Sequence, residues 1–202
     1  MYLLAETSAL IEAETTGPNI MVKQMEKQSL PDDPEFSQLV RELAQCLTAK
    51  GWSLATAESC TGGWIAKCCT DLAGSSAWFE RGFVSYSNRA KHDLLGVAPD
   101  VLEAEGAVSE AVAQQMAEGA RRRAGVSVAL SVTGIAGPDG GSADKPVGTV
   151  WFGWSLQGQA VYSDLQCFKG DRDAVRRQTV AHALSGLLAL LTNERLGMSV
   201  RE

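Results

Sequence analysis

The change from a strand-like to a helix-like pattern at residues 56–63 constrains the fold of this chain more than any other feature. The apolar run from Trp52 to Ala57 stops at small and hydroxylated residues, and a helix-like pattern follows from Trp64 to Leu72. In α/β proteins ligands bind at the carboxyl ends of strands, and a helix start exposes backbone N–H groups that hold anions. Two glycines, Gly62 and Gly63, let a ligand approach the backbone closely. Ser59 is therefore a candidate nucleophile at the binding edge of an α/β domain.

The first 34 residues differ from the rest of the chain. They show no sustained periodicity, so we interpret residues 1–34 as a poorly ordered or locally helical extension, in which residues 3–13 suit a short helix. We expect residues 35–195 to form one domain. It begins with a helix, because apolar residues recur at helical spacing from Phe36 to Leu47.

Helices and strands alternate through this domain. We predict strands at 52–57, 79–86, 126–132, 147–156 and 159–168, and helices at 62–72, 88–95, from Pro99, from Ser109 to near Gly125, and at 171–192. The last two strands flank Gln157-Gly158, which favours a β-hairpin and an antiparallel part of the sheet. The expected fold class is α/β: a layered α/β/α domain with a mixed, partly parallel sheet.

Length and charge exclude several functional classes. The chain has 202 residues, enough for a sizeable core, and its net charge of −6 argues against general nucleic-acid binding. No apolar run reaches the roughly 20 residues that span a membrane, and the N-terminus lacks the pattern of a signal peptide. We therefore expect neither a membrane nor a nucleic-acid partner.

Cysteine and histidine usage bears on metals and on the compartment. The five cysteines contain no CxxC pair, and the chain has only two histidines. This pattern supports neither a zinc site nor a disulfide framework, so we expect no metal. Free thiols fit a reducing environment, and we expect a cytoplasmic protein.

A serine nucleophile needs a neighbouring base, and the chain offers few. His92 and His182 lie outside the glycine-rich and hydroxyl-rich clusters, and we interpret both as structural. Lys91 is the alternative base, because burial and a helix start both disfavour the charge of a lysine. Tyr86, just upstream, is a candidate to relay a proton or to orient the lysine. From spacing alone, a surface Lys91 and a Tyr86 at the edge of the core are the competing interpretation.

Two rival nucleophile patterns deserve comparison with Ser59. Cys60 shares the same helix start, although a buried cysteine more often fills the core. Ser142-Ala-Asp-Lys145 matches the SxxK pattern of penicillin-binding proteins, but neighbouring glycines and a proline predict a loop rather than the required helix. The GxSxG pattern of lipases is absent around Ser59. Ser59 and Cys60 remain the candidates.

A second glycine cluster, Thr133-Gly-Ile-Ala-Gly-Pro-Asp-Gly-Gly141, follows the predicted buried strand at 126–132. Such loops expose successive N–H groups that suit phosphate or carboxylate, although this one is neither a Walker A loop nor a dinucleotide fingerprint. Arg172, at the start of the last predicted helix, is placed to grip a phosphate. A plain connection and a surface arginine are the alternatives, but two glycine clusters at strand ends favour a shared pocket.

These segments resemble a known family, the C-terminal domain of the competence/damage-inducible protein CinA. The resemblance covers about residues 36–192, and larger family members carry an N-terminal molybdopterin-binding-like domain that this chain lacks. The motifs are Thr56-Ala-Glu-Ser-Cys-Thr-Gly-Gly63, Gly82-Phe-Val-Ser-Tyr-Ser-Asn88 with Ala90-Lys91, Gly106-Ala-Val-Ser109, Thr133-Gly-Ile-Ala-Gly-Pro138 and Pro146-Val-Gly-Thr149.

The resemblance implies an enzyme. Single-domain members of this family are nicotinamide-nucleotide amidohydrolases, which convert nicotinamide mononucleotide to the acid and ammonia in pyridine nucleotide recycling. It implies that Ser59 is the nucleophile and Lys91 the base, with Tyr86 assisting and without a cofactor. It also implies a homo-oligomer.

The resemblance and the two glycine clusters together imply where substrate binds. Backbone N–H groups near Cys60 to Gly63 are expected to stabilise an oxyanion, and the Thr133–Gly141 loop with Arg172 is expected to hold the ribose phosphate. The expected substrate-binding residues are Glu58, Cys60, Thr61, Gly62, Gly63, Ser87, Asn88, Thr133, Gly134, Ala136, Gly137, Gly140, Gly141 and Arg172.

Two other functions remain open at the level of sequence. A non-catalytic nucleotide-binding module of the same family would bind nicotinamide mononucleotide without releasing ammonia. A cysteine-dependent amidase would use Cys60, so that replacing Cys60 abolishes activity and replacing Ser59 spares it.

Overall fold

The computed structural model describes residues 34–192 and 199–200. The helix expected at 3–13 and nearly all of the extension expected at 1–34 lie outside the described residues. The elements are α2 (Pro34–Lys50), β1 (Leu54–Glu58), α3 (Trp64–Asp71), the 3₁₀ turn η1 (Ser75–Ala77), β2 (Phe79–Val84), α4 (Asn88–Leu95), α5 (Pro99–Glu105), α6 (Glu110–Ala124), β3 (Val128–Gly134), β4 (Thr149–Leu156), β5 (Tyr162–Cys167), α7 (Arg172–Thr192) and β6 (Ser199–Val200).

The strands form one mixed sheet of six strands in the order β2-β1-β3-β4-β5-β6. β2, β1 and β3 run parallel, whereas β4, β5 and β6 each run antiparallel to the preceding strand. In this register Ala57 of β1 pairs with Phe83 of β2 on one side and with Ser131 of β3 on the other. The carboxyl ends of the three parallel strands therefore meet at one edge.

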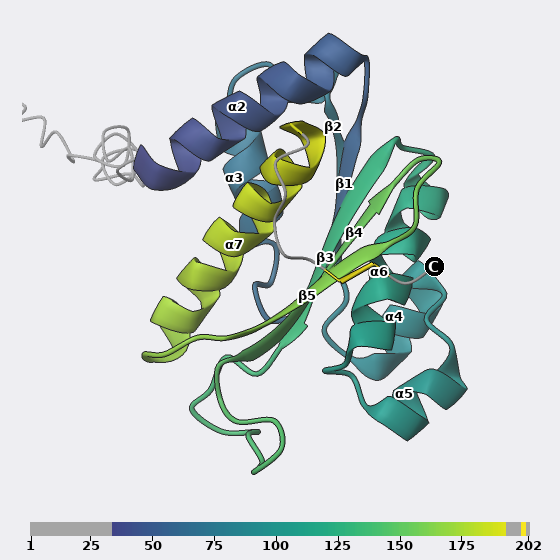
Figure 1. The fold of residues 1–202 in the computed structure, drawn as a ribbon, viewed down its shortest axis with the longest axis vertical. Coiled ribbons are helices and arrows are strands. Elements are labelled where there is room, and N and C mark those ends of the chain that lie inside the picture. Colours follow the sequence, from purple (N-terminus) through teal and green to yellow (C-terminus); the bar gives the residue numbers. More distant parts are fainter. Residues whose placement is uncertain (1–33, 193–198, 201–202) are drawn as a thin grey trace, which may run out of the picture. The chain divides into compact units, whose positions relative to one another are not determined.

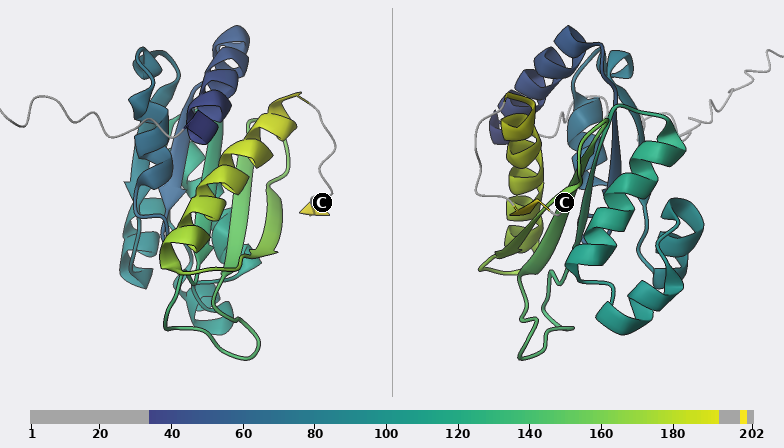
Figure 2. Two further views of the ribbon diagram at one scale, coloured as in Figure 1. Left: turned by 90° about the vertical axis from the view of Figure 1, so that its left-hand side faces the viewer. Right: turned by 45° about the vertical axis from the view of Figure 1, so that its right-hand side comes forward.

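Helices cover both faces of the sheet. α2, α3 and α7 lie on one face, and α4, α5 and α6 lie on the other (Figures 1 and 2). β3 shows how side-chain alternation supplies both layers, since Val128, Leu130 and Val132 join the core under α7 whereas Ala129 joins the core under α6. The α/β fold class with three layers and a mixed sheet, predicted from the sequence, is confirmed.

Close backbone approach holds α6 on its face of the sheet. The sheet residues beneath it are small, and Ala55, Ala57 and Ala129 are fully buried there. A Cβ on Gly153 of β4 would lie 2.6 Å from the carbonyl oxygen of Ala113 in α6. The Oγ of Ser131 donates a hydrogen bond to that same carbonyl at 2.6 Å. Small side chains, rather than large ones, therefore set the position of α6.

α4, the helix that carries Lys91, has well-defined ends. The Oγ of Ser87 caps its start by accepting the N–H of Ala90 at 3.1 Å, and Gly96 ends it in the left-handed conformation with φ 74°. α6 packs against the last residue of α4, because a Cβ on Gly119 would lie 1.9 Å from the carbonyl oxygen of Leu95. The absence of a side chain at residue 119 thus fixes where α4 lies.

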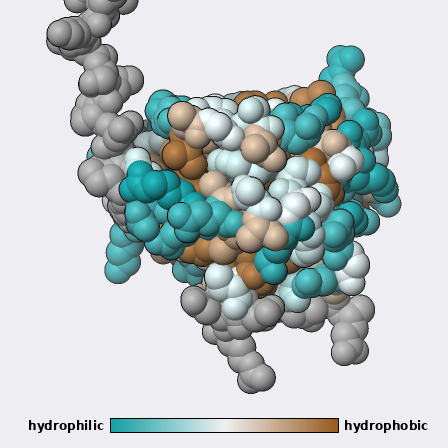
Figure 3. Space-filling view, turned by 90° about the horizontal axis from the view of Figure 1, so that it is seen from above, coloured by the Kyte–Doolittle hydropathy of each residue, from teal (hydrophilic) through white to brown (hydrophobic). Residues whose placement is uncertain are grey.

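Several helices and strands begin or end at one edge of the sheet. β2, β1 and β3 finish there, β4 begins there, and β5 finishes there before α7 starts. The loop between β3 and β4 extends from this edge at the bottom of Figure 1. Figure 3 looks onto the opposite end of the sheet, where hydrophobic residues are interspersed among hydrophilic ones. Among the described helices, none is long and apolar enough to cross a membrane.

From residue 34 onward, the predicted helices and the five predicted strands are confirmed, with shifted bounds. β1 continues through Glu58 because its backbone still pairs with both neighbouring strands there. α3 starts at Trp64 rather than at residue 62, because Gly62 and Gly63 adopt positive φ angles of 64° and 97°. The sequence predicts neither η1 nor β6, because elements of two or three residues carry no periodic pattern.

We expect Gly119→Ala to destabilise the domain by about 1–3 kcal/mol or more, because the added methyl group overlaps the Leu95 carbonyl and displaces α4. Denaturant unfolding measures this change. Gly158→Ala is the matched control: a Cβ there meets open space, so only its φ of 73° opposes the change, at about 1–2 kcal/mol. A Gly119→Ala protein as stable as wild type would contradict the packing argument.

Candidate active site

Ser59 lies directly beyond the last residue of β1. Its backbone N–H donates to the carbonyl of Val132 on β3 at 3.1 Å, which fixes the residue at the end of the sheet. The residue is 8% exposed, and its Oγ accepts a hydrogen bond from Lys91 Nζ at 3.0 Å. The structure therefore joins the two residues that the sequence selects as nucleophile and base, across 32 positions of the chain.

Lys91 is a buried lysine without a carboxylate partner among the contacts of the described residues. It is 1% exposed, and its Nζ donates to Ser59 Oγ and, at 2.8 Å, to the carbonyl oxygen of Ser85. Burial lowers the pKa of Lys91 from 10.5 to about 8, and the charge interaction with Cys60 opposes this shift. A lysine with such a pKa is neutral in part near physiological pH and can then accept a proton.

Glu58 is a buried carboxylate that caps α3 from the strand side. Its two oxygens accept the backbone N–H groups of Gly63, Ile65 and Ala66 at 3.0, 3.0 and 2.8 Å. The Oγ1 of Thr61 donates to it at 2.7 Å as well. The sequence places Glu58 and Thr61 among the substrate-binding residues, but these contacts instead use both side chains to close the turn that follows Ser59.

This cap changes which backbone groups face a ligand. The N–H of Gly63 donates to Glu58, and the N–H of Gly62 donates to the carbonyl of Ser59 at 3.2 Å. The sequence assigns both glycines to the oxyanion site, and the structure engages both donors within the turn. In the part of the chain that the structure describes, the N–H groups of Cys60 and Thr61 make no hydrogen bond to another residue. Within the turn, these two N–H groups are the ones that the protein leaves unused.

Cys60 is buried beside Ser59 and is a poor candidate nucleophile. Burial raises the pKa of its thiol from 9.0 to about 11, so the thiol stays protonated at neutral pH. The negative charge of Glu58 acts in the same direction as burial. The geometry thus favours Ser59 over Cys60, the alternative that the sequence leaves open.

Two arginines at the start of α7 hold the two loops of the site. Arg176 Nε and Nη2 donate to the carbonyls of Cys60 at 3.2 Å and Thr61 at 2.9 Å. One turn earlier, Arg172 Nη1 donates to the carbonyl of Gly137 at 2.9 Å. The sequence predicts a role for Arg172 and misses Arg176. The pair was detectable as two arginines spaced i, i+4 on one helix.

Packing within the protein explains most glycines of the second cluster. A Cβ would lie 2.7 Å from Val150 at Gly134, and 2.6 and 2.8 Å from Val147 at Gly137 and Gly141. Gly140 differs, because its nearest neighbour would be 3.7 Å away while its φ is +90°. The loop is therefore closely folded on itself, and close approach by a ligand is not the only reason for its glycines.

The remaining members of the predicted binding set divide by burial. Thr133 is 1% exposed and donates to the carbonyl of Ala107 at 2.7 Å, and Ala136 lies in the core. Ser87 caps α4, and Asn88 is exposed at its first position.

Tyr86, the predicted assistant of Lys91, is 68% exposed, and its hydroxyl makes no hydrogen bond to Ser59 or Lys91. Assistance by Tyr86 stays a prediction.

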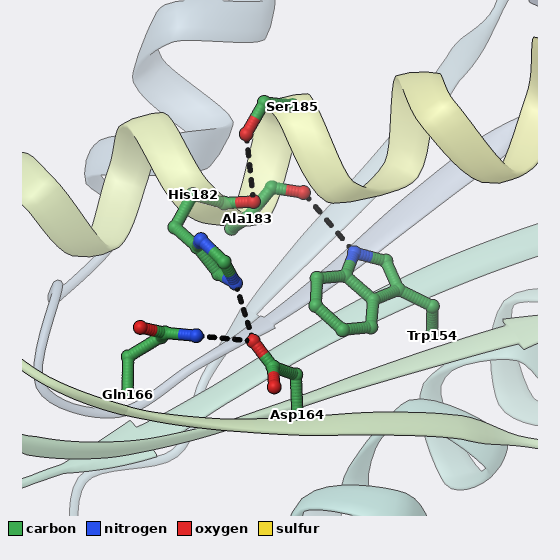
Figure 4. Close-up of polar contacts among 6 residues, drawn as sticks. All are labelled: Trp154, Asp164, Gln166, His182, Ala183 and Ser185. Carbon is green, nitrogen blue, oxygen red and sulfur yellow. Dashed lines mark hydrogen bonds and ion pairs between the residues drawn. The ribbon is translucent and has the colours of Figure 1, made fainter. Parts of the chain in front are cut away.

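The two histidines lie outside this site, as their sequence context indicates. His182 Nε2 and Gln166 Nε2 both contact Asp164 Oδ2 at 2.7 Å, between α7 and β5 (Figure 4). The Nδ1 of His92 contacts the carbonyl of Val97 at 3.0 Å. Among the described residues, no group of three or more His, Cys, Asp or Glu side chains is arranged to hold a metal ion.

Comparison with protein families and curated sequences identifies close relatives. The profile of the CinA C-terminal domain matches residues 36–191. The nicotinamide-nucleotide amidohydrolase PncC of Escherichia coli (strain K12) is 56% identical over 155 residues, which are 77% of this chain and 94% of that protein. The protein of the same name from Pseudomonas putida is 52% identical over 161 residues, covering 79% of this chain and 99% of that protein.

Solved structures with the same fold carry related names. The competence damage-inducible protein A of Klebsiella pneumoniae subsp. pneumoniae MGH 78578 matches with a TM-score of 0.76 and 40% identity, covering 79% of this chain and 99% of that chain. The competence/damage inducible protein CihA of Agrobacterium tumefaciens matches with a TM-score of 0.75 and 45% identity, covering 77% and 95% of the two chains.

We expect Glu58→Gln to lower the free energy of unfolding by at least about 2 kcal/mol, because an amide nitrogen would face buried N–H donors at the start of α3. Denaturant unfolding monitored by circular dichroism measures the loss. Glu80→Gln is the control: Glu80 pairs with Arg81 at the surface, so its change should stay within about 0.5 kcal/mol. A Glu58→Gln protein as stable as wild type would contradict the capping role.

Proposed function

This chain belongs to the CinA C-terminal domain family, and we propose that it hydrolyses nicotinamide mononucleotide with Ser59 as nucleophile and Lys91 as general base. The amidohydrolase activity follows from relatives with that name that are 56%, 58% and 52% identical over most of their lengths. The observation that carries the mechanism is the buried hydrogen bond of 3.0 Å between Lys91 Nζ and Ser59 Oγ. It places a lysine of lowered pKa on a serine at a strand end.

Acylation is the first half of the proposed reaction. Neutral Lys91 takes the proton of the Ser59 hydroxyl as Oγ forms a bond to the carboxamide carbon of the substrate. The carbonyl oxygen becomes an oxyanion in the tetrahedral intermediate. When that intermediate collapses, the carbon–nitrogen bond breaks, and Lys91 returns its proton to the departing nitrogen. Ammonia leaves, and the acyl group stays on Ser59 as an ester.

Deacylation repeats these steps with water. Neutral Lys91 takes a proton from a water molecule, whose oxygen attacks the ester carbon. Collapse of the second intermediate breaks the bond to Ser59 Oγ, which recovers its proton from Lys91. The balance is nicotinamide mononucleotide plus water giving nicotinic acid mononucleotide plus ammonia. No electron is transferred, and no cofactor takes part in these steps.

We assign substrate binding to the loops around Ser59 and Lys91, the proposed catalytic dyad. The backbone N–H groups of Cys60 and Thr61 are the proposed oxyanion donors, each worth about 3–4 kcal/mol in comparable sites. Arg172 is the proposed phosphate ligand together with the loop at 134–141, because its side chain reaches that loop and carries further N–H donors. Arg176 holds the carbonyls of Cys60 and Thr61 in the turn that carries the proposed nucleophile.

The cellular setting is part of the proposal. The described cysteines are all free, which fits a reducing compartment, and we infer a cytoplasmic enzyme that works in pyridine nucleotide recycling. A homo-oligomeric state stays a prediction, to be measured by light scattering of the purified protein.

We expect Ser59→Ala to reduce ammonia release from nicotinamide mononucleotide by at least about a thousandfold, because no other group takes over the covalent step. Cys60→Ala should keep most of the activity, since its protonated thiol takes no part. A coupled ammonia assay on both folded variants decides the matter. Inactive Cys60→Ala beside active Ser59→Ala would move the nucleophile to Cys60. A folded wild type that binds the nucleotide in calorimetry without releasing ammonia would instead indicate a binding module.

We expect kcat/KM to rise with pH through about 8 and then to level off, because only neutral Lys91 accepts a proton and burial has lowered its pKa from 10.5. At pH 7 roughly a tenth of Lys91 is then neutral. The pH–rate profile measures this rising part of the curve, the limb of kcat/KM. Lys91→Arg is the control and should be inactive at every pH, because a guanidinium does not lose its proton in this range. An active Lys91→Arg enzyme would exclude Lys91 as the base.

A further inference from the structure

The hydroxyl of Ser85 is a buried polar group without a partner. Ser85 lies between β2 and α4, is 0% exposed, and its Oγ is the buried side-chain atom that makes no hydrogen bond among the described residues. Its main chain, in contrast, is fully engaged: the N–H donates to the carbonyl of Glu58 at 2.8 Å, and the carbonyl accepts from Lys91 Nζ at 2.8 Å. Such an orphan hydroxyl in a native core requires an explanation.

Lys91 Nζ has fewer hydrogen-bond acceptors around it than it has donors when protonated. A protonated lysine has three N–H donors and no acceptor. The structure gives Nζ two acceptors, Ser59 Oγ and the carbonyl oxygen of Ser85, while the side chain is 1% exposed. Among the described residues, one N–H of the protonated form therefore has no acceptor. A buried charged donor without a partner is costly.

Other polar side chains near the dyad are already used. Both oxygens of Glu58 accept from the start of α3, and Thr61 Oγ1 donates to the same carboxylate. Thr56 Oγ1 also contacts Glu58, at 3.4 Å. The Cys60 thiol, whose pKa is raised, stays protonated. Ser85 Oγ thus has unused lone pairs and belongs to the residue whose carbonyl already contacts Nζ.

We propose that the Ser85 hydroxyl accepts the third N–H of Lys91 when Lys91 carries the proton of Ser59, which makes Ser85 a positioning residue for the dyad. The inference rests on the proposed function and assigns Ser85 no contact with substrate. Rotation about the single Cα–Cβ bond moves Oγ between staggered positions without moving the backbone that contacts Nζ. The bond forms only with protonated Lys91, so above about pH 8, where resting Lys91 is mostly neutral, it stabilises the transition state rather than the resting enzyme.

The experiment compares stability with kinetics in Ser85→Ala. If the hydroxyl is an unused orphan, its removal leaves the protein equally or more stable and fully active. If it serves protonated Lys91, then at about pH 9, where most resting Lys91 is neutral, stability is equal or higher while kcat falls at least about tenfold with KM unchanged within about twofold. The proposal thus predicts that kcat falls while stability does not, whereas a general loss of structure would lower both.

The pH profile supplies a readout that packing alone does not change. Accepting a hydrogen bond from the protonated form raises the pKa of Lys91, so Ser85→Ala should shift the limb of kcat/KM to lower pH. Glu58 and Cys60, the titratable groups of the adjoining turn, are unchanged in this variant. Ser85→Thr retains a hydroxyl and should restore kcat and the position of the limb.

Ser163→Ala is the matched control. Ser163 is also 0% exposed, but its Oγ is paired, donating to Glu110 at 2.7 Å and accepting from Gln114 at 3.0 Å. Its replacement should lower stability and leave kcat and the pH limb unchanged. Wild-type kcat in Ser85→Ala, or a change in KM alone, would overturn the inference. Failure of the wild type to release ammonia would instead overturn the proposed function, which keeps the two outcomes distinct.

Discussion

The contact between the Glu58 carboxylate and the start of α3 is the interaction on which the rest of the site depends. Glu58 precedes Ser59 directly and is fully buried, and it gathers backbone donors from three residues of the following turn and helix. The turn that carries Ser59 is therefore fixed at both ends, by the sheet and by this carboxylate. The negative charge also neutralises the positive end of α3, so the helix dipole contributes little field at the nucleophile.

With the helix field offset, burial decides the chemistry of the dyad. The same exclusion of water has opposite effects on two neighbouring groups, because it always disfavours the charged form. It brings the pKa of Lys91 down to about 8 and takes that of the Cys60 thiol up to about 11. Burial thus lowers the pKa of the proposed base and raises the pKa of the competing candidate nucleophile. A serine, which is neutral at rest, loses least from such an environment.

The sequence predicts the layers of the fold and its dyad, but not how the site is held. Periodicity and caps such as Ser87 locate the helices, and the β-hairpin follows from its turn. Ser59 and Lys91 follow from residue type and from their places after strands, although spacing alone also suits a surface lysine. The capping role of Glu58 is missed because its partners depend on how the turn folds back. Arg176 is missed because its contact with Cys60 spans 116 positions.

The two arginine contacts of α7 also order the assembly of the site in time. Synthesis proceeds from the N-terminus, so the nucleophile, the base and the glycine-rich loop all leave the ribosome before residues 172 and 176. Until α7 docks, the carbonyls of Cys60, Thr61 and Gly137 lack their guanidinium partners. A nascent chain that ends within β5 contains Ser59 and Lys91 but lacks the arginine side chains that hold the two loops. Both loops of the candidate site are therefore held only after the last helix has docked.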